Sequence, residues 1–552
     1  MNQFKPKLFS VLKSYTKEQF IKDVISGIIV AIIALPLSIA LALASGVGPE
    51  QGIYTAIFAG FVISFLGGSR VQIAGPTAAF ATIVAGIVAE KGMDGLIVAT
   101  IMAGILLIIM GFLKFGNLIR FIPYTITTGF TFGIAVTILV GQIKDFFGLT
   151  IEGAPISTID KIKSCVSGIH TMQLQALLIG VICLVILIVW PKVNKVIPGS
   201  LIAVIVSIIL VKALHMDVKT IGDLYTISNK LPGITLPNVN LTMVKELLPD
   251  AFTIAVLAGI ESLLSCVVSD GMIGSRHKPN MELVAQGAGN VASALFGGIP
   301  ATGAIARTAA NVKSGGRTPI AGMVHSVTLL IILVVLMPYA EWIPMPAIAA
   351  ILFMVAYNMS GWKEFVSLIK RSPKSDILVL VTTFVLTVIF DLVVAIEVGI
   401  VMAALLFLKR MSDVTEIKSW KYLGEEYDEE NDPDKISLRK VPKGTLVYEI
   451  CGPMFFAAAD KFLKISMEPG IKAVVLRMRS VPAMDVTALH SLQQMVATCK
   501  KKNITLIMSH VQEQPMAMMK KAGFDEEVGM ENFCAHIDDA LMRAENLVNQ
   551  KE

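Results

Sequence analysis

Two short segments combine Gly/Pro turns with small, hydroxyl-bearing or basic residues inside otherwise apolar regions. Their members are Gly75, Pro76, Thr77 and Ala78 in the first segment, and Ala301, Thr302, Gly303 and Arg307 in the second. We expect each turn to open a short helix, with Pro76 in the first turn and the second helix beginning near Ala301. The free N–H groups and the positive dipole end of such a helix favour an anion. Thr77 and Thr302 could add hydroxyl donors, whereas the alternative interpretation is a pair of packing kinks rich in small residues.

Two charged residues within apolar runs are the other candidates for a functional role. Glu261 is flanked by apolar residues, and an ionisable group at membrane depth indicates a functional site. If neutral, Glu261 could carry a proton; if ionised, it could help to bind Na⁺ together with Ser265, one turn along on the same helix face. The alternative role is a salt bridge to a basic residue. Arg307 could hold the charge of an anion, pair with Glu261, or extend to the surface as a snorkelling side chain.

The composition is that of a membrane protein. Hydrophobic residues make up 54% of the chain and charged residues 16%, against about 25% charged residues in soluble domains. The small net charge of +5 argues against a nucleic-acid partner. The six cysteines are scattered without a CxxC pair, and no nucleophile–base set or metal-ligand cluster is present, so we expect neither an enzyme nor a bound cofactor or structural metal.

Apolar runs of roughly 15–25 residues recur from Ile21 to Leu408 and predict about fourteen membrane crossings. They lie near 21–45, 51–67, 76–90, 95–113, 119–140, 172–190, 199–214, 249–273, 282–296, 302–313, 318–337, 343–359, 376–390 and 392–408. Lys and Arg concentrate in alternate short loops, which predicts that both termini are cytoplasmic. The polar, Lys-rich stretch before Ile21 has no apolar core and is typical of a retained cytoplasmic tail.

The two halves share one pattern of helices. Each half has a helix pair, a Gly-Gly turn (Gly67-Gly68 and Gly297-Gly298), an interrupted short helix and further full helices. Seven helices per half is an odd number, so the second half is expected to be inverted relative to the first. The two interruptions should then face each other and form the binding site.

After Leu408 the chain becomes soluble in character. Lys409-Arg410 is expected to end the last helix, and the acidic stretch from Glu425 to Asp434 is typical of a linker. Strands are predicted at 445–450, 473–478 and 505–509, with helices near 457–467, 485–502 and 513–522. This alternation predicts a small α/β domain. The expected organisation is a tail (1–20), a transmembrane domain (21–408), a linker (409–436) and a cytoplasmic domain (437–552).

Several motifs resemble the sulfate permease (SulP) family of anion transporters. They are Ile73-Ala74-Gly75-Pro76-Thr77-Ala78, Gly298-Ile299-Pro300-Ala301-Thr302-Gly303, Arg307-Thr308-Ala309-Ala310-Asn311 and Ser314-Gly315-Gly316-Arg317-Thr318-Pro319. The tail resembles the STAS domain of that family, and Thr487 occupies the position phosphorylated in related anti-sigma-factor antagonists. The alternative for Thr487 is helix capping together with Asp485. The stretch Gly259-Ile260-Glu261-Ser262-Leu263-Leu264 looks most similar to a bacterial branch that includes a C4-dicarboxylate carrier.

The resemblance implies an inverted repeat of seven plus seven helices, in which a core domain moves against a gate domain, and a homodimer. It also implies transport of sulfate, bicarbonate, chloride or dicarboxylates, and cation coupling through the acidic residue at position 261. The prediction is therefore a secondary active anion transporter of the bacterial inner membrane that symports H⁺ or Na⁺ by an elevator-type movement. The alternatives are an uncoupled anion channel, uptake of C4-dicarboxylates rather than inorganic anions, and a membrane sensor that signals through the tail to a cytoplasmic partner.

Overall fold

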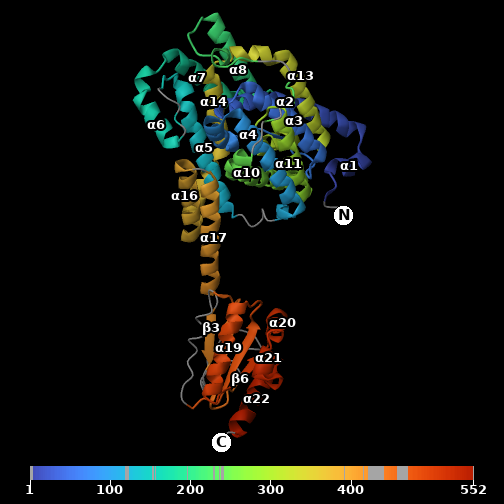
Figure 1. Ribbon diagram of the computed structural model, residues 1–552, viewed down its shortest axis with the longest axis vertical. Coiled ribbons are helices and arrows are strands. Elements are labelled where there is room, and N and C mark those ends of the chain that lie inside the picture. The colour runs from blue at the N-terminus through green and yellow to red at the C-terminus, as the bar shows by residue number, and fades with distance from the viewer. Residues whose placement is uncertain are drawn as a thin grey trace. The chain divides into compact units, whose positions relative to one another are not determined.

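The computed structural model describes residues 4–550 apart from 118–122, 152–154, 156, 195–196, 228–230, 235–236, 238–240, 391, 415, 421–439 and 457–469. The chain forms two compact units, Met1–Ile400 and Val401–Glu552. The first unit is helical and the second is built around a sheet (Figure 1).

Every apolar run predicted to cross the membrane corresponds to a helix. In the first half these are α2 (Lys17–Ala44), α3 (Pro49–Leu66), η3 (Ala78–Phe80) continuing into α4 (Ala81–Phe112), α5 (Tyr124–Phe147), α7 (Leu174–Val193) and α8 (Gly199–Ala213). In the second half they are α10 (Leu241–Ile273), α11 (Pro279–Leu295), α12 (Ile305–Lys313), α13 (Pro319–Leu336), α14 (Met345–Ser360), α16 (Lys374–Ile389) and α17 (Leu392–Val414). Predicted crossings three and four are both within α4 and meet at Gly92, whose φ of 69° breaks the helix.

Seven helices in the described part of the chain are long and apolar enough to span a membrane on length and composition alone. The other predicted crossings correspond to shorter or more polar helices, and α12, with nine residues, is too short to span a bilayer. Four further short helices are α1 (Lys7–Val11), α6 (Thr158–Ser167), α9 (Ile221–Leu224) and α15 (Trp362–Arg371).

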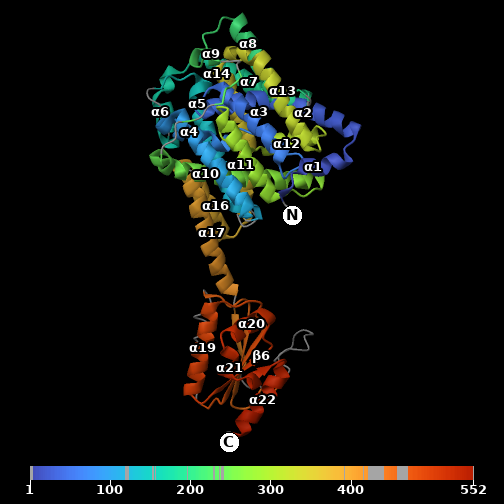
Figure 2. The same cartoon turned by 45° about the vertical axis from the view of Figure 1, so that its right-hand side comes forward.

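Packing between the helices repeats from one half to the other. The contact of α2 with α13 corresponds to the contact of α10 with α4 in the other half. In the same way, α3 with α13 corresponds to α11 with α4, and α5 with α16 corresponds to α14 with α7. The same exchange maps the α2–α3 pair onto the α10–α11 pair. The first unit is therefore an inverted repeat. Helices α2–α4 and α10–α13 form its core domain, and α5, α7, α8, α14, α16 and α17 form its gate domain (Figures 1 and 2).

The second unit has a five-stranded sheet in the order β3-β4-β5-β6-β7. Strands β4 (Thr445–Cys451), β5 (Ala473–Ser480), β6 (Thr505–Ser509) and β7 (Phe533–Cys534) are parallel, and β3 (Glu416–Trp420) is an antiparallel edge strand. Alternate residues of the central strands point to opposite faces of the sheet. Leu446 and Leu476 join a core that includes α19 (Val486–Lys501), whereas Val447 and Val475 join another that includes α22 (Ile537–Gln550).

Three of the strands, β4, β5 and β6, and two of the helices of this second unit were predicted correctly. Helices α19 and α20 (Glu513–Lys521) match their expected ranges, whereas α21 (Phe524–Val528), α22 and the short strand β7 were not predicted. The helix expected near 457–467 lies outside the described residues. Lys409-Arg410 does not end the last helix, because α17 continues to Val414, and β3 lies within the stretch predicted as linker. An edge strand depends on its pairing partner β4, which local composition does not reveal.

One buried carboxylate holds the turn that follows α3. Glu282 of α11 is fully buried. Its Oε2 accepts the amides of Gly68 and Ser69 at 2.8 and 3.0 Å, and its Oε1 accepts the side-chain amides of Gln72 and Gln286 at 3.0 and 2.9 Å. Glu282 therefore ties the Gly-Gly turn of the first half to a helix of the second half.

Glu282→Ala should destabilise the protein strongly. The substitution leaves four buried donors without this acceptor, and each unsatisfied donor costs about 1–3 kcal/mol. Thermal unfolding of the detergent-purified protein measures the effect, with Glu364→Ala on the exposed side of α15 as the control. Equal melting temperatures for the two variants would contradict the structural role of Glu282.

Candidate functional site

The two interruptions of the helical pattern are paired with each other. Strand β1 (Ala74–Gly75) runs antiparallel to β2 (Thr302–Gly303), with Ala74 opposite Gly303 and Gly75 opposite Thr302. The amide of Ala304 also donates to the carbonyl of Ile73 at 2.9 Å. The segments that we expected to face each other are thus joined by a short two-stranded sheet inside the core domain.

The helices at the two interruptions begin later than predicted. The first turn starts at Ala78 rather than at Pro76, and α12 starts at Ile305 rather than near Ala301. The reason is the β1–β2 pairing, which keeps the preceding residues extended. The first N–H groups of each helix have no intrahelical acceptor. These amide ends begin two or three residues after the paired strands and are the backbone groups that could receive an anion.

The second interruption is fastened to its surroundings by polar side chains. Asn290 of α11 accepts from the amide of Ala301 at 2.8 Å and donates to its carbonyl at 2.9 Å. The amide of Gly303 donates to the hydroxyl of Ser262 at 3.0 Å. The hydroxyl of Thr302, for which we expected a contact with the anion, instead donates to the carbonyl of Ala258 at 3.0 Å. Ala301, Thr302 and Gly303 therefore build the site mainly through their backbone position.

Arg307 brings a positive charge from the second half to the break in the first. The residue is only 3% exposed, and its Nη2 donates to the carbonyl of Pro76. Its Nη1 has no hydrogen-bond partner among the described residues and lies where a side chain at Gly75 would collide with it. No ion pair joins Arg307 to Glu261 in the described part of the chain, and burial excludes a snorkelling role. A buried cation without a counter-charge is costly, so the site favours an anion.

Glu261 contacts the first interruption through Thr77. The Thr77 hydroxyl donates to Glu261 Oε2 at 2.9 Å. Ser265 does not bond to Glu261. Its hydroxyl points to Thr308 Oγ1 at 3.4 Å, and Thr308 accepts the amide of Ile73 at 3.0 Å. Ser265 therefore supports β1. Among the described residues, no cluster of three or more His, Cys, Asp or Glu side chains could hold a metal ion.

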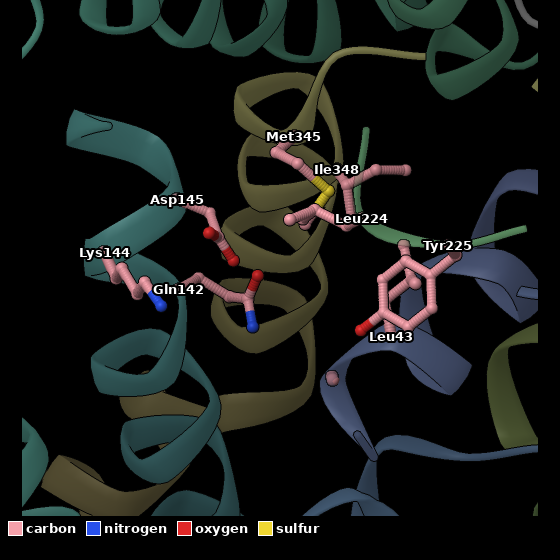
Figure 3. Close-up of a pocket in the computed structure, with 9 residues that line it drawn as sticks. Leu43, Gln142, Lys144, Asp145, Leu224, Tyr225, Met345 and Ile348 are labelled. Carbon is pink, nitrogen blue, oxygen red and sulfur yellow. The ribbon is translucent and has the colours of Figure 1, made fainter. Parts of the chain in front are cut away.

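A separate pocket of about 330 Å³ lies between the core and gate domains. It is lined by the end of α2 (Leu43, Ala44), by α5 (Gln142, Lys144, Asp145), by α9 and the next residue (Leu224, Tyr225), and by α14 (Met345, Ile348). Figure 3 shows the side chains of Gln142 and Asp145 extending from α5 toward α14. Because its walls belong to both domains, movement of one domain against the other would change this pocket.

Sequence reasoning missed the polar residues that support the paired strands. Glu282, Gln286 and Asn290 follow one another at intervals of four residues in α11 and share one helix face. This spacing in an otherwise small and apolar helix was a usable signal. Ser262 and Thr308 had no comparable signal, because single hydroxyl residues are common in membrane helices.

In the second unit, Asp485 caps α19. Its Oδ1 accepts the amide of Ala488 at 2.9 Å, and its Oδ2 accepts the amide of Phe456 at 2.8 Å. Thr487 is exposed in the first turn of the helix and makes no cap. Asp485 is therefore the capping residue of α19, and Thr487 is not.

A helical inverted repeat with two paired interruptions, joined to a small α/β domain, is the architecture of a class of membrane anion transporters. The chain belongs to the sulfate permease family, whose model matches residues 20–383, and a STAS domain model matches residues 438–540. The expected family and fold class are therefore confirmed, and the members of this family are transporters.

The relatives of the chain include transporters of two different anions. YvdB of Bacillus subtilis, provisionally named a sulfate transporter, is 39% identical over 532 residues, covering 96% of this chain and 98% of YvdB. The bicarbonate transporter BicA of Picosynechococcus sp. is 30% identical over 508 residues, covering 88% of each chain. The murine anion transporter Slc26a9 has the same fold, with a TM-score of 0.88 at 19% identity over 98% of this chain and 94% of the other.

Gly75→Ala should weaken anion binding by about tenfold, equivalent to about 1.4 kcal/mol. The added methyl group would collide with the Arg307 guanidinium and displace it from the paired strands. Gly86→Ala is the matched control, because a methyl group there meets no atom within 4 Å. Calorimetric titration of both purified variants with sulfate and with bicarbonate measures the difference. Equal affinities in the two variants would show that the position of Arg307 is unimportant for binding.

Proposed function

We propose that this chain is a secondary active anion transporter whose substrate binds between the amide ends that follow β1 and β2. The observation that supports this best is Arg307, a buried guanidinium without a counter-charge among the described residues. One Nη atom is held by the Pro76 carbonyl, which fixes the orientation of the group. The other Nη atom remains available to an acceptor on the anion.

The substrate is a small anion of the sulfate, bicarbonate or C4-dicarboxylate class. Gly75, Pro76, Thr77 and Ala78 would contribute the first side of the site. The second side would come from the segment Ala301, Thr302 and Gly303 and from Arg307. All of these anions carry oxygen atoms that accept from backbone amides and from a guanidinium. The relatives named for bicarbonate and, provisionally, for sulfate support inorganic anions first.

Glu261 would couple anion transport to H⁺ or Na⁺ symport. Its carboxylate is linked by a single hydrogen bond to Thr77, the residue that precedes the first amide end. An ionised Glu261 would repel an anion bound at those amides. A proton or Na⁺ at Glu261 would remove this repulsion, so that the cation and the anion are best bound together. Ser265 would act indirectly, by supporting β1 through Thr308.

The movement would be of the elevator type, with the core domain carrying the anion against the gate domain. Both interruptions, Arg307 and Glu261 belong to the core domain, so that one rigid body would hold the whole site. The same proposal includes a transmembrane domain at 21–408, a STAS domain at 437–552 and a homodimer. It also includes a plasma-membrane location with cytoplasmic termini and a partner of the STAS domain that responds to Thr487. The short inner loops rich in Lys and Arg support the orientation.

Glu261→Gln should abolish gradient-driven uptake and leave anion binding intact. The amide keeps the size of the side chain but cannot take up or release a proton or neutralise a sodium ion. Uptake of sulfate, bicarbonate, fumarate and succinate into proteoliposomes, with imposed pH or Na⁺ gradients, measures this effect. Glu90→Gln, an exposed carboxylate of α4, is the control.

The same assay separates carrier from channel. A carrier concentrates the anion against its gradient, and this concentration collapses with the cation gradient. Concentrative uptake by Glu261→Gln at the native level would reject the coupling role. If the native protein instead showed only downhill anion flux, at a rate independent of the imposed pH and Na⁺ gradients, the result would favour an uncoupled channel.

A further inference from the structure

Helix α15 is a short amphipathic helix that connects two gate helices, α14 and α16. It begins after Gly361, whose φ is 55°, and ends before the Ser372-Pro373 pair. Its ten residues are far too few to cross a bilayer, which needs about 20 residues. The helix therefore has to lie beside the membrane or within the protein.

One side of α15 is fastened to the gate domain by aromatic rings. Phe365 is the buried residue of the helix. Its ring stacks on Phe132 of α5, with centroids 4.3 Å apart, and meets Phe384 of α16 edge-on at 5.5 Å. Any force on α15 would therefore reach both α5 and α16.

Apolar side chains outside this contact remain exposed on α15. Trp362, Val366 and Ile369 are 43%, 38% and 39% exposed. Their spacing of four and three residues places them along one face of the helix. An exposed face that carries Trp together with branched aliphatic residues is typical of helices lying in the membrane interface.

Basic side chains lie near this apolar face: Lys363 and Lys370 on one flank of it, Arg371 at the end of α15 and Lys374 at the start of α16. Lys363, Lys370, Arg371 and Lys374 are all exposed, and none is in an ion pair with another described residue. Lys363 Nζ lies 5.8 Å from the centre of the Trp362 ring. Glu364 is the one acidic residue within the helix. The surface thus combines an apolar stripe with an excess of positive charge that the described part of the protein does not neutralise.

We propose that α15 binds the headgroups of anionic phospholipids and thereby anchors the gate domain to the membrane surface. The apolar face would enter the boundary between headgroups and acyl chains, and the four basic residues would contact phosphate groups. Through Phe365 this anchor would restrain α5 and α16. An anionic lipid fits better than an acidic protein, because Trp362, Val366 and Ile369 would then be buried by the same partner that neutralises the charge.

The test uses the full-length protein purified in neutral detergent, with phosphatidylglycerol or phosphatidylcholine added. The variant is the triple substitution Lys363→Gln, Lys370→Gln and Arg371→Gln. The control, Lys500→Gln, Lys501→Gln and Lys520→Gln, removes the same charge from exposed residues of the second unit. Thermal stability and lipid retention in native mass spectrometry are the readouts.

Phosphatidylglycerol should stabilise the native protein and the control, and phosphatidylcholine should stabilise neither. Binding of phosphatidylglycerol to the α15 variant should be weaker by on the order of a hundredfold. Lys363→Arg with Lys370→Arg should retain binding, which separates loss of charge from misfolding. Equal retention of phosphatidylglycerol by the α15 variant and the control would overturn the proposal. A changed oligomeric mass without a changed lipid effect would also overturn it and would assign the surface to contact between copies.

Discussion

The fold of the membrane unit depends on one short pairing of extended backbone between its two halves. Within a bilayer, backbone N–H and C=O groups that leave a helix must find partners inside the protein. Strands β1 and β2 form hydrogen bonds with each other's backbone. Other backbone amides beside this pairing donate to the side chains of Asn290, Ser262 and Thr308. This arrangement places two helix N-termini beside a single point, which neither half could achieve alone.

The charges around that point differ in how completely they are satisfied. Glu282 accepts four hydrogen bonds, so its surroundings hold the side chain in one structural position. Among the described residues, Glu261 accepts one hydrogen bond, from Thr77. Arg307 donates to one carbonyl, and its Nη1 has no hydrogen-bond partner there. Glu261 and Arg307 belong to one domain but do not pair with each other in the described part of the chain. This difference from Glu282 supports the proposal that Glu261 and Arg307 respond to ligands.

The sequence predicted those parts of the architecture that depend on local chemistry. Gly/Pro turns marked the two interruptions, and isolated charges marked Glu261 and Arg307, because such residues are rare within apolar runs. The start of α12 at Ile305 could not be predicted, because it depends on pairing with a strand from the other half. The hydrogen bond from Thr302 to Ala258 and the edge strand β3 were not predicted for the same reason, because each depends on a partner that is distant in the sequence. The Lys and Arg residues of the short loops indicated only the orientation of the helices, because the packing of α15 through Phe365 depends on the folded structure.

The central claim is that the anion lies between the two amide ends and beside Arg307. An experimental structure of the protein with selenate, located by its anomalous scattering, tests this most directly. The account predicts one selenium peak within hydrogen-bond distance of Arg307 Nη1 and of the first amides of η3 and α12. A peak elsewhere, with Arg307 still bonded only to the Pro76 carbonyl, would contradict it.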